Sequence, residues 1–243
     1  MLTVMTYNVG AGLADPERLV EILRRSGADI IGVQELAPDQ GAAIAALLGD
    51  DYPYQVLHPT GIPGKGLISR FPLRQTELLE LHPGRPDLQV IVAAPDGDLT
   101  VIVAHPPPPR IGRHRIRHAV LADQQISSIT AVATGGNPTV LLTDFNRVGW
   151  QAAYRQLRQS GLIDAFGTAG RGTGFTLPTR LSHLAYRGHR LGDLPLPPML
   201  RVDYVWHTTH FRTVDSWIGG NAGSDHLPVL AKLVRIDGSL DDG

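Results

Sequence analysis

The sequence predicts an α/β protein in which two β-sheets pack face to face and helices cover the outside. Strand-like and helix-like segments alternate along the whole chain. Some neighbouring strands are joined by short turns and others by helices, which indicates mixed sheets. The 243 residues are 42% hydrophobic, enough to build a sizeable core. We expect residues 1–236 to form one domain and residues 237–243 to be a frayed tail.

The first part of the chain is predicted to alternate strand and helix twice. Residues 2–9, LTVMTYNV, are rich in strand-forming residues. A helix follows, with Asp15 as its N-cap and Pro16 at its first position. Residues 28–36, ADIIGVQEL, form a nearly continuous apolar run, which is typical of a strand buried on both faces. The next helix is predicted to place these residues on one apolar face: Ile44, Leu47 and Leu48.

The remainder is predicted to be rich in strands. Five apolar runs are separated by Pro, Gly and Asp: YQVLH, GLISR, TELLEL, LQVIVAA and LTVIVAH. APDGDL between the last two predicts a hairpin turn. A helix over about 112–133 precedes a buried strand at 139–146, TVLLTDFN. The next helix is predicted from apolar residues at helical spacing: Trp150, Ala153, Tyr154 and Leu157. Residues 167–199 are predicted to be a long loop before three final strands.

Composition excludes several kinds of site and location. The chain has no cysteine, so disulfides, thiolate zinc sites and cysteine nucleophiles are excluded. A net charge of −1 does not indicate a globally basic nucleic-acid binder. No apolar run reaches the roughly 18 residues of a membrane-spanning helix, and the N-terminal stretch lacks the features of a signal peptide. We therefore expect a cytoplasmic monomer.

Polar residues interrupt the apolar runs where predicted strands meet loops. If these strand ends converge, they bring together four carboxylates, two amides and two imidazoles: Asn8, Glu35, His105, Asp144, Asn146, Asp203, Asp225 and His226. Taken singly, Asn8 could be a turn residue, and Asp144 with Asn146 could form an Asx turn. A lone Asp203 inside an apolar run, however, needs a partner.

Such a cluster would repel itself unless a cation lay within it. Oxygen and imidazole ligands suit Mg²⁺ or Mn²⁺ better than a structural zinc. A histidine paired with an aspartate can take a proton from water, so the set indicates hydrolysis of a phosphate ester. A zinc site at His207, His210 and His226 is rejected because residues three apart in a strand point to opposite faces.

Six short motifs resemble, in order, those of the endonuclease/exonuclease/phosphatase superfamily: TYNV, VQE, AHP, TDFN, RVDYV and SDHLPV. The resemblance covers residues 3–233. It implies a four-layered α/β sandwich with the site at one edge of the paired sheets. It also implies a metal-dependent phosphate-ester hydrolase. Thr143 stands where the commonest motif has Gly, which we expect to alter the geometry modestly.

The resemblance implies a role for each matching residue. Glu35 should bind Mg²⁺ or Mn²⁺, assisted by Asn8 and Asp225. His226 should be the general base or the partner of the scissile phosphate, oriented by Asp203. The remaining three roles follow the same motifs: Asp144 positions water or protonates the leaving group, Asn146 holds a phosphoryl oxygen, and His105 lies on the leaving-group side.

The sequence indicates the substrate less strongly than it indicates the reaction. Arg110, Arg113 and Arg115 follow the His105 loop, and a local basic patch would attract a polyanion such as DNA or RNA. This favours a nuclease. A phosphatase or phosphodiesterase for a small or lipid-linked phosphate is the alternative, supported by the near-zero net charge. A non-catalytic binding module is the third reading, which the intact set of reacting groups opposes.

Overall fold

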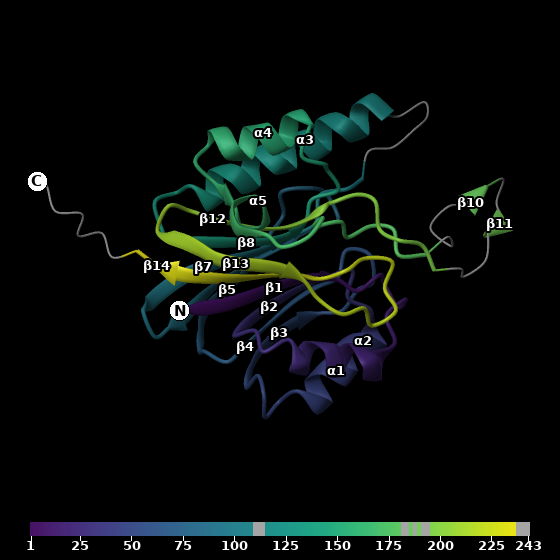
Figure 1. Cartoon of the computed structure of the whole chain (residues 1–243), viewed down its shortest axis with the longest axis horizontal. Coiled ribbons are helices and arrows are strands. Elements are labelled where there is room, and N and C mark those ends of the chain that lie inside the picture. The colour runs from purple at the N-terminus through teal and green to yellow at the C-terminus, as the bar shows by residue number, and fades with distance from the viewer. Residues whose placement is uncertain (109–114, 181–184, 187–188, 191–194, 237–243) are drawn as a thin grey trace, which may run out of the picture.

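The computed structural model describes residues 1–108, 115–180, 185–186, 189–190 and 195–236. Two six-stranded mixed sheets pack face to face (Figure 1). The first has the order β13 (Phe211–Ile218), β14 (Val229–Arg235), β1 (Leu2–Asn8), β2 (Ile30–Gln34), β4 (Lys65–Ser69) and β3 (Tyr54–His58). The second has the order β5 (Leu73–Leu79), β6 (Asp87–Ala94), β7 (Gly97–Ala104), β8 (Thr139–Asp144), β12 (Asp203–His207) and β9 (Ile163–Asp164).

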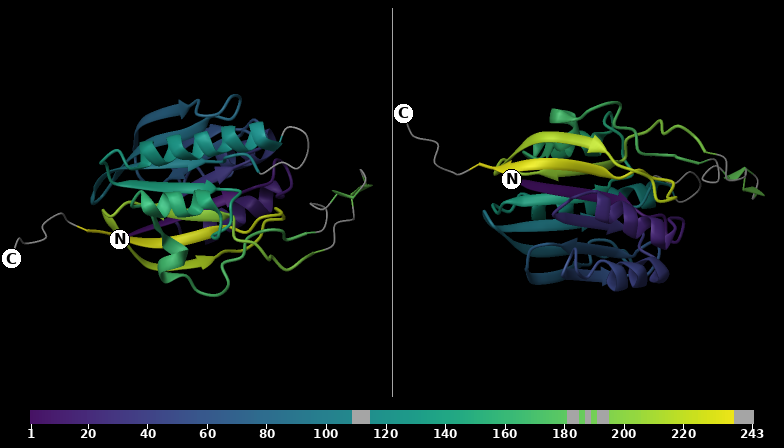
Figure 2. Two further views of the ribbon diagram at one scale, coloured as in Figure 1. Left: turned by 90° about the horizontal axis from the view of Figure 1, so that it is seen from above. Right: turned by 60° about the horizontal axis from the view of Figure 1, so that its bottom comes forward.

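Helices cover the outer face of each sheet. α1 (Pro16–Arg25) and α2 (Pro38–Leu47) lie on the first sheet, and α3 (Arg115–Ala133) and α4 (Ala152–Gln159) lie on the second (Figures 1 and 2). One apolar cluster fills the space between the sheets, and one lies beneath each helical layer. The short α5 (Ala165–Ala169) packs against β13. The predicted fold class, a four-layered α/β sandwich, is confirmed.

Local sequence signals explain most boundaries. The Asp15 carboxylate accepts a hydrogen bond from the Arg18 amide at 2.9 Å, which confirms it as the N-cap of α1. The hairpin between β6 and β7 is also confirmed, with Gly97 at φ +102°. Two paired strands of two residues each, β10 (Ala185–Tyr186) and β11 (His189–Arg190), lie within the predicted long loop.

Two predicted helix positions are wrong. Leu47 is 50% exposed because α2 ends there and only its neighbour Leu48 turns into the core. Trp150 is 72% exposed because it precedes α4. The Gln151 amide donates to the Val148 carbonyl at 2.9 Å, so a turn occupies this stretch and Trp150 does not follow the helical period.

Several strand ends lie at one edge of the paired sheets. β1 and β2 run parallel, as do β7 and β8, so the carboxyl ends of these four strands point the same way within each sheet. β12 runs antiparallel to β8 and pairs its first residue, Asp203, with the last residue of β8, Asp144. This edge lies at the end of the molecule opposite the N-terminus, from which β10 and β11 also project (Figures 1 and 2).

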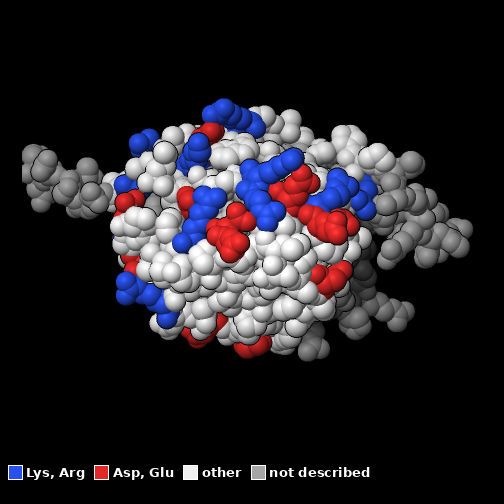
Figure 3. Space-filling model, turned by 90° about the horizontal axis from the view of Figure 1, so that it is seen from below, with Lys and Arg blue, Asp and Glu red and all other residues white. Residues whose placement is uncertain are grey.

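The surface seen on the side of α1 and α2 carries basic and acidic groups in mixed order (Figure 3). Arg24 pairs with Asp51 and Arg25 pairs with Glu21 in this part of the chain. This face therefore presents no extended surface of one charge. Among the helices that the structure describes, none has the length and apolarity needed to cross a bilayer.

Candidate active site

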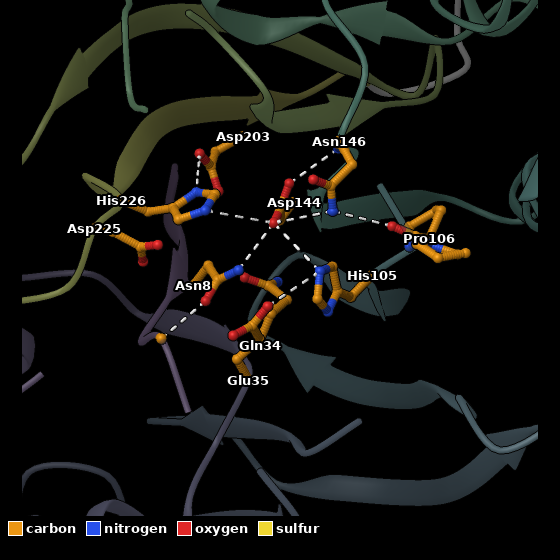
Figure 4. Close-up of polar contacts among 12 residues, drawn as sticks. Asn8, Gln34, Glu35, His105, Pro106, Asp144, Asn146, Asp203, Asp225 and His226 are labelled. Atoms are coloured by element: carbon orange, nitrogen blue, oxygen red, sulfur yellow. Dashed lines mark hydrogen bonds and ion pairs between the residues drawn. The ribbon is translucent and has the colours of Figure 1, made fainter. Parts of the chain in front are cut away.

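Asp144 lies at the centre of the polar cluster (Figure 4). Its side chain is 1% exposed. The Oδ2 atom accepts a hydrogen bond from Asn8 Nδ2 at 2.8 Å and one from Asn146 Nδ2 at 3.4 Å. His105 Nε2 lies 3.4 Å from the same oxygen, and His226 Nε2 lies 3.8 Å from it. Residues from both sheets thus converge on one carboxylate oxygen.

This arrangement keeps Asp144 ionised. Burial alone would raise its pKa, but the charge of His226 and the contacts with His105 and Asn8 outweigh burial. The pKa of Asp144 is therefore held well below its ordinary value. At neutral pH this group is a carboxylate and an acceptor of hydrogen bonds.

His226 and Asp203 form a buried pair beside Asp144. His226 Nδ1 lies 2.9 Å from Asp203 Oδ2, and the two side chains are 5% and 0% exposed. In the charged imidazolium both ring nitrogens carry a proton, so Nδ1 donates to Asp203 and Nε2 faces Asp144. Burial would lower the pKa of His226, but Asp203 and Asp144 raise it to about 10. Burial raises the pKa of Asp203, and the charge of Asp144 adds to this effect.

Three oxygen-bearing residues lie around the same cluster: Asn8, Glu35 and Asp225 (Figure 4). Glu35 directly follows β2 with φ +54°, an uncommon conformation for a residue with a side chain. Its side chain is 22% exposed, and Oε1 lies 3.5 Å from His105 Nε2. Asp225 is 4% exposed, and its Oδ1 lies 3.4 Å from Ser224 Oγ. Asn8 Oδ1 accepts one from the Gly10 amide at 2.9 Å.

The donor set fits a divalent cation. Asp203 Oδ1 is buried and has no hydrogen-bond partner. Within the described residues, Asp144, Asp203 and His226 place ligand atoms within 4.8 Å of one another. Glu35 is the most accessible of the four carboxylates in the cluster, and its oxygens suit Mg²⁺ or Mn²⁺. Glu35 and Asp225 do not belong to the tight group of three, so their metal-binding role stays a prediction.

The loop after β8 is tied to the proline run after His105. Asn146 has φ +50° and donates from Nδ2 to the Pro106 carbonyl at 3.1 Å. Arg147, which is 5% exposed, donates from Nη1 to the Pro107 carbonyl at 3.3 Å. Because proline has no N–H, these carbonyls are the groups through which the segment can be held. The two contacts hold Pro106 and Pro107 beside Asp144.

The structure leaves the predicted basic residues undescribed, and it shows why His207 cannot bind zinc. Arg110, Arg113 and the side chain of Arg115 lie outside the described part of the chain. Both ring nitrogens of His207 are engaged, by the Thr208 carbonyl at 2.8 Å and by Thr213 Oγ1 at 2.7 Å, which leaves neither for zinc.

Sequence reasoning missed Ser224, which orders the last motif. Its hydroxyl donates to the Asn8 carbonyl at 2.7 Å and accepts from the His226 amide at 3.1 Å. A serine hydroxyl can bond the backbone two residues further along, and this turn tendency was the available signal. It also missed Lys65 and Asp87, both fully buried near His105. An aspartate opening an apolar strand was the available signal.

The two packed sheets and the carboxylate–histidine cluster at their shared edge define a hydrolase that acts on phosphate esters. The model of the Endonuclease/Exonuclease/phosphatase family matches residues 5–226, and this chain belongs to that family. Members of the family depend on divalent metal ions. Among curated proteins, none matches this chain.

Solved structures of similar proteins share the fold. An endonuclease/exonuclease/phosphatase from Beutenbergia cavernae is 21% identical with a TM-score of 0.70, covering 98% of this chain and 72% of that one. A mannosyl-6-phosphatase from Bacteroides thetaiotaomicron is 17% identical with a TM-score of 0.70, covering 96% and 100%. Sphingomyelinase C from Streptomyces griseocarneus is 19% identical with a TM-score of 0.68, covering 95% and 98%.

Proposed function

We propose that this chain is a divalent-metal-dependent phosphodiesterase that hydrolyses DNA or RNA by attack of a water molecule that His226 activates. The observation that carries this proposal is the buried pair of His226 and Asp203, 2.9 Å apart, next to the ionised Asp144. A histidine oriented by a carboxylate is a general arrangement for moving a proton to or from water. The pair lies in a cluster rich in carboxylates, which suits a cation and a phosphate.

Glu35, Asn8 and Asp225 would hold the cation. Glu35 offers an accessible carboxylate, Asn8 offers the free lone pair of its Oδ1, and Asp225 lies close enough to His226 to act on its pKa. A bound divalent cation would offset the negative charge of the cluster, polarise a phosphoryl oxygen and lower the pKa of the neighbouring imidazole.

His226 exchanges its proton at Nε2. Asp203 holds the proton on Nδ1, so the opposite nitrogen faces the centre of the cluster. With the pKa at about 10, His226 is an imidazolium at neutral pH when nothing offsets the surrounding carboxylates. A bound cation would offset that negative charge and allow Nε2 to act as a base. In the charged form it would instead donate to a phosphoryl oxygen.

Three further residues position the reacting groups. Because the pKa of Asp144 is held low, we propose that Asp144 positions the attacking water and does not protonate the leaving group. Asn146 would hold a phosphoryl oxygen by giving up its longer contact, the one of 3.4 Å to Asp144, while keeping Pro106. His105 would act on the leaving-group side, since its Nε2 lies between Glu35 and Asp144.

The proposal that the substrate is a nucleic acid rests on three arginines of the sequence, Arg110, Arg113 and Arg115. A small or lipid-linked phosphate is the second candidate. It is favoured by Trp150, 72% exposed, and Met199, 57% exposed, which lie on segments next to the site-bearing strands β8 and β12. The names of two structural neighbours, a mannosyl-6-phosphatase and a sphingomyelinase, are in line with that candidate.

A substrate panel separates the candidates. Plasmid DNA, single-stranded RNA, phosphomonoesters and sphingomyelin vesicles would be compared with the natural chain and a triple variant, R110A/R113A/R115A. A nuclease should nick plasmid, and the triple variant should show a higher KM and a weaker salt dependence, since each phosphate contact adds to the salt slope. Release of phosphate from monoesters with intact plasmid would favour the second candidate.

A further inference from the structure

A buried ion pair crosses from one sheet to the other directly behind the active site. Lys65 Nζ, at the start of β4, lies 3.7 Å from Asp87 Oδ1, at the start of β6. The side chains are 1% and 0% exposed. Lys65 belongs to the first sheet and Asp87 to the second, so the pair joins the two sheets at the edge that carries the cluster.

Asp87 is bound to the His105 backbone. Its Oδ1 accepts a hydrogen bond from the His105 amide at 3.1 Å, and its Oδ2 accepts one from Gln125 Nε2 at 2.7 Å. The first bond holds His105 at the point where β7 ends. The second ties the same carboxylate to α3, so Asp87 is held from two sides.

Lys65 is linked in the same way to the segment that carries Glu35. It lies opposite Gln34, the residue before Glu35, in the pairing of β2 with β4. Its Nζ donates to the Pro63 carbonyl at 3.3 Å, and the next carbonyl along, that of Gly64, accepts from the Leu36 amide at 3.2 Å. The backbone on both sides of Glu35 is therefore held by the segment that Lys65 orders.

We propose that Lys65 and Asp87 are positioning residues that set the separation of Glu35 and His105 across the two sheets. The inference rests on the proposed function, because it concerns the residues assigned there to the metal and to the leaving group. Asp87 contacts the backbone of His105, and Lys65 contacts the loop beside Glu35. Their positioning effect passes through these contacts.

Burial of this ion pair opposes the charged form of both side chains. Burial lowers the pKa of Lys65 and raises that of Asp87, with each charge opposing the effect of burial on the other. A buried ion pair replaced by neutral groups of similar shape commonly leaves stability unchanged or improved, whereas removal of one partner is harmful. Stability and positioning can therefore be separated by experiment.

The test uses the double variant Lys65→Met/Asp87→Leu, which removes both charges and the acceptor of the His105 amide. A milder form, Lys65→Met/Asp87→Asn, keeps an acceptor for that amide. The control is Leu99→Ala, a cavity in the core at the opposite end of β7. Urea unfolding, kcat, KM and Mn²⁺ affinity without substrate, by electron paramagnetic resonance, would be measured on all of them.

We expect the folded double variant to lose about 10-fold or more in kcat and in Mn²⁺ affinity, the usual effect of disturbing groups behind a metal site. KM should change less than kcat. Leu99→Ala should unfold at lower urea but keep its kcat. If this variant is unfolded, the milder Lys65→Met/Asp87→Asn supplies the comparison, because it still loses the bond from Lys65 Nζ to the Pro63 carbonyl.

A folded variant with the same kcat and Mn²⁺ affinity as the natural chain would overturn the inference. The proposed function would still stand. If the natural chain hydrolyses no phosphate ester, the proposed function fails instead. The Mn²⁺ affinities then still decide whether the pair positions Glu35.

Discussion

Replacement of Asp203 by asparagine should impair catalysis in a chain that stays folded. The variant keeps the shape of the side chain but removes the charge that His226 contacts at 2.9 Å. A hydrogen bond to a charged group contributes about 1.5–3 kcal/mol. If that contribution is realised in the transition state, its loss lowers the rate by roughly 10- to 150-fold.

A second effect adds to this loss. An asparagine amide can donate to Nδ1 and so move the histidine proton to Nε2, the nitrogen that must accept a proton from water. We therefore expect kcat to fall by about 100-fold or more, within the range typical of a positioned acid–base group.

Stability should fall as well, but not enough to unfold the chain. Burial and the charge of Asp144 raise the pKa of Asp203, whereas the charge of His226 lowers it. A neutral amide removes the first two costs but also the attraction to His226. The free energy of unfolding at pH 7 should therefore fall by about 1–3 kcal/mol, the size of one hydrogen bond to a charged group.

The assay is steady-state hydrolysis of bis(p-nitrophenyl) phosphate with Mn²⁺, beside urea unfolding. Asp215→Asn is the matched control: this carboxylate on β13 pairs with Arg171 at 2.6 Å, away from the cluster. It should keep the natural kcat. A folded Asp203→Asn protein with more than about a third of the natural kcat would refute the assignment of Asp203 as the residue that orients His226.

Three other variants test separate parts of the account. His226→Ala should lower kcat by about 10²–10⁴-fold with the fold intact by circular dichroism, and a rate above about a tenth of the natural one would remove it as the general base. Glu35→Ala should raise the Mn²⁺ concentration needed for half-maximal activity by at least about 10-fold, and an unchanged metal titration would place the cation elsewhere. Burial lowers the pKa of His207, so the unfolded chain binds more protons below about 6.5 and stability falls as the pH falls through that value. His207→Gln should flatten this dependence in urea unfolding between about pH 6.5 and 5, and equal slopes in the two proteins would argue against it.

The fold was largely predictable because its signals are local. Apolar runs such as residues 28–36 and the cap formed by Asp15 and Pro16 act within a few residues, and the structure confirms both elements. Trp150 and Leu47 were misplaced because helical spacing alone does not show where a helix begins or ends. In both cases a turn or a helix end places the side chain in solvent.

The convergence of the cluster was predictable from polar residues at strand ends, together with the family resemblance. Asp144 and Asn8 are 136 positions apart and yet form a hydrogen bond of 2.8 Å. The raised pKa of His226 could not be read from the sequence, because it depends on two carboxylates brought near it by β8 and β12. The pair of Lys65 and Asp87 was equally hidden, since it forms only when the two sheets pack.

The most direct test of the central claim is metal-dependent hydrolysis by the natural chain and an Asp144→Asn variant. Both would be given plasmid DNA and a phosphate-ester panel with Mg²⁺, Mn²⁺ or EDTA. The account predicts hydrolysis by the natural chain that EDTA abolishes and added Mn²⁺ restores, with little turnover by Asp144→Asn at any metal concentration. Hydrolysis that persists in EDTA, or that Asp144→Asn retains, would contradict it.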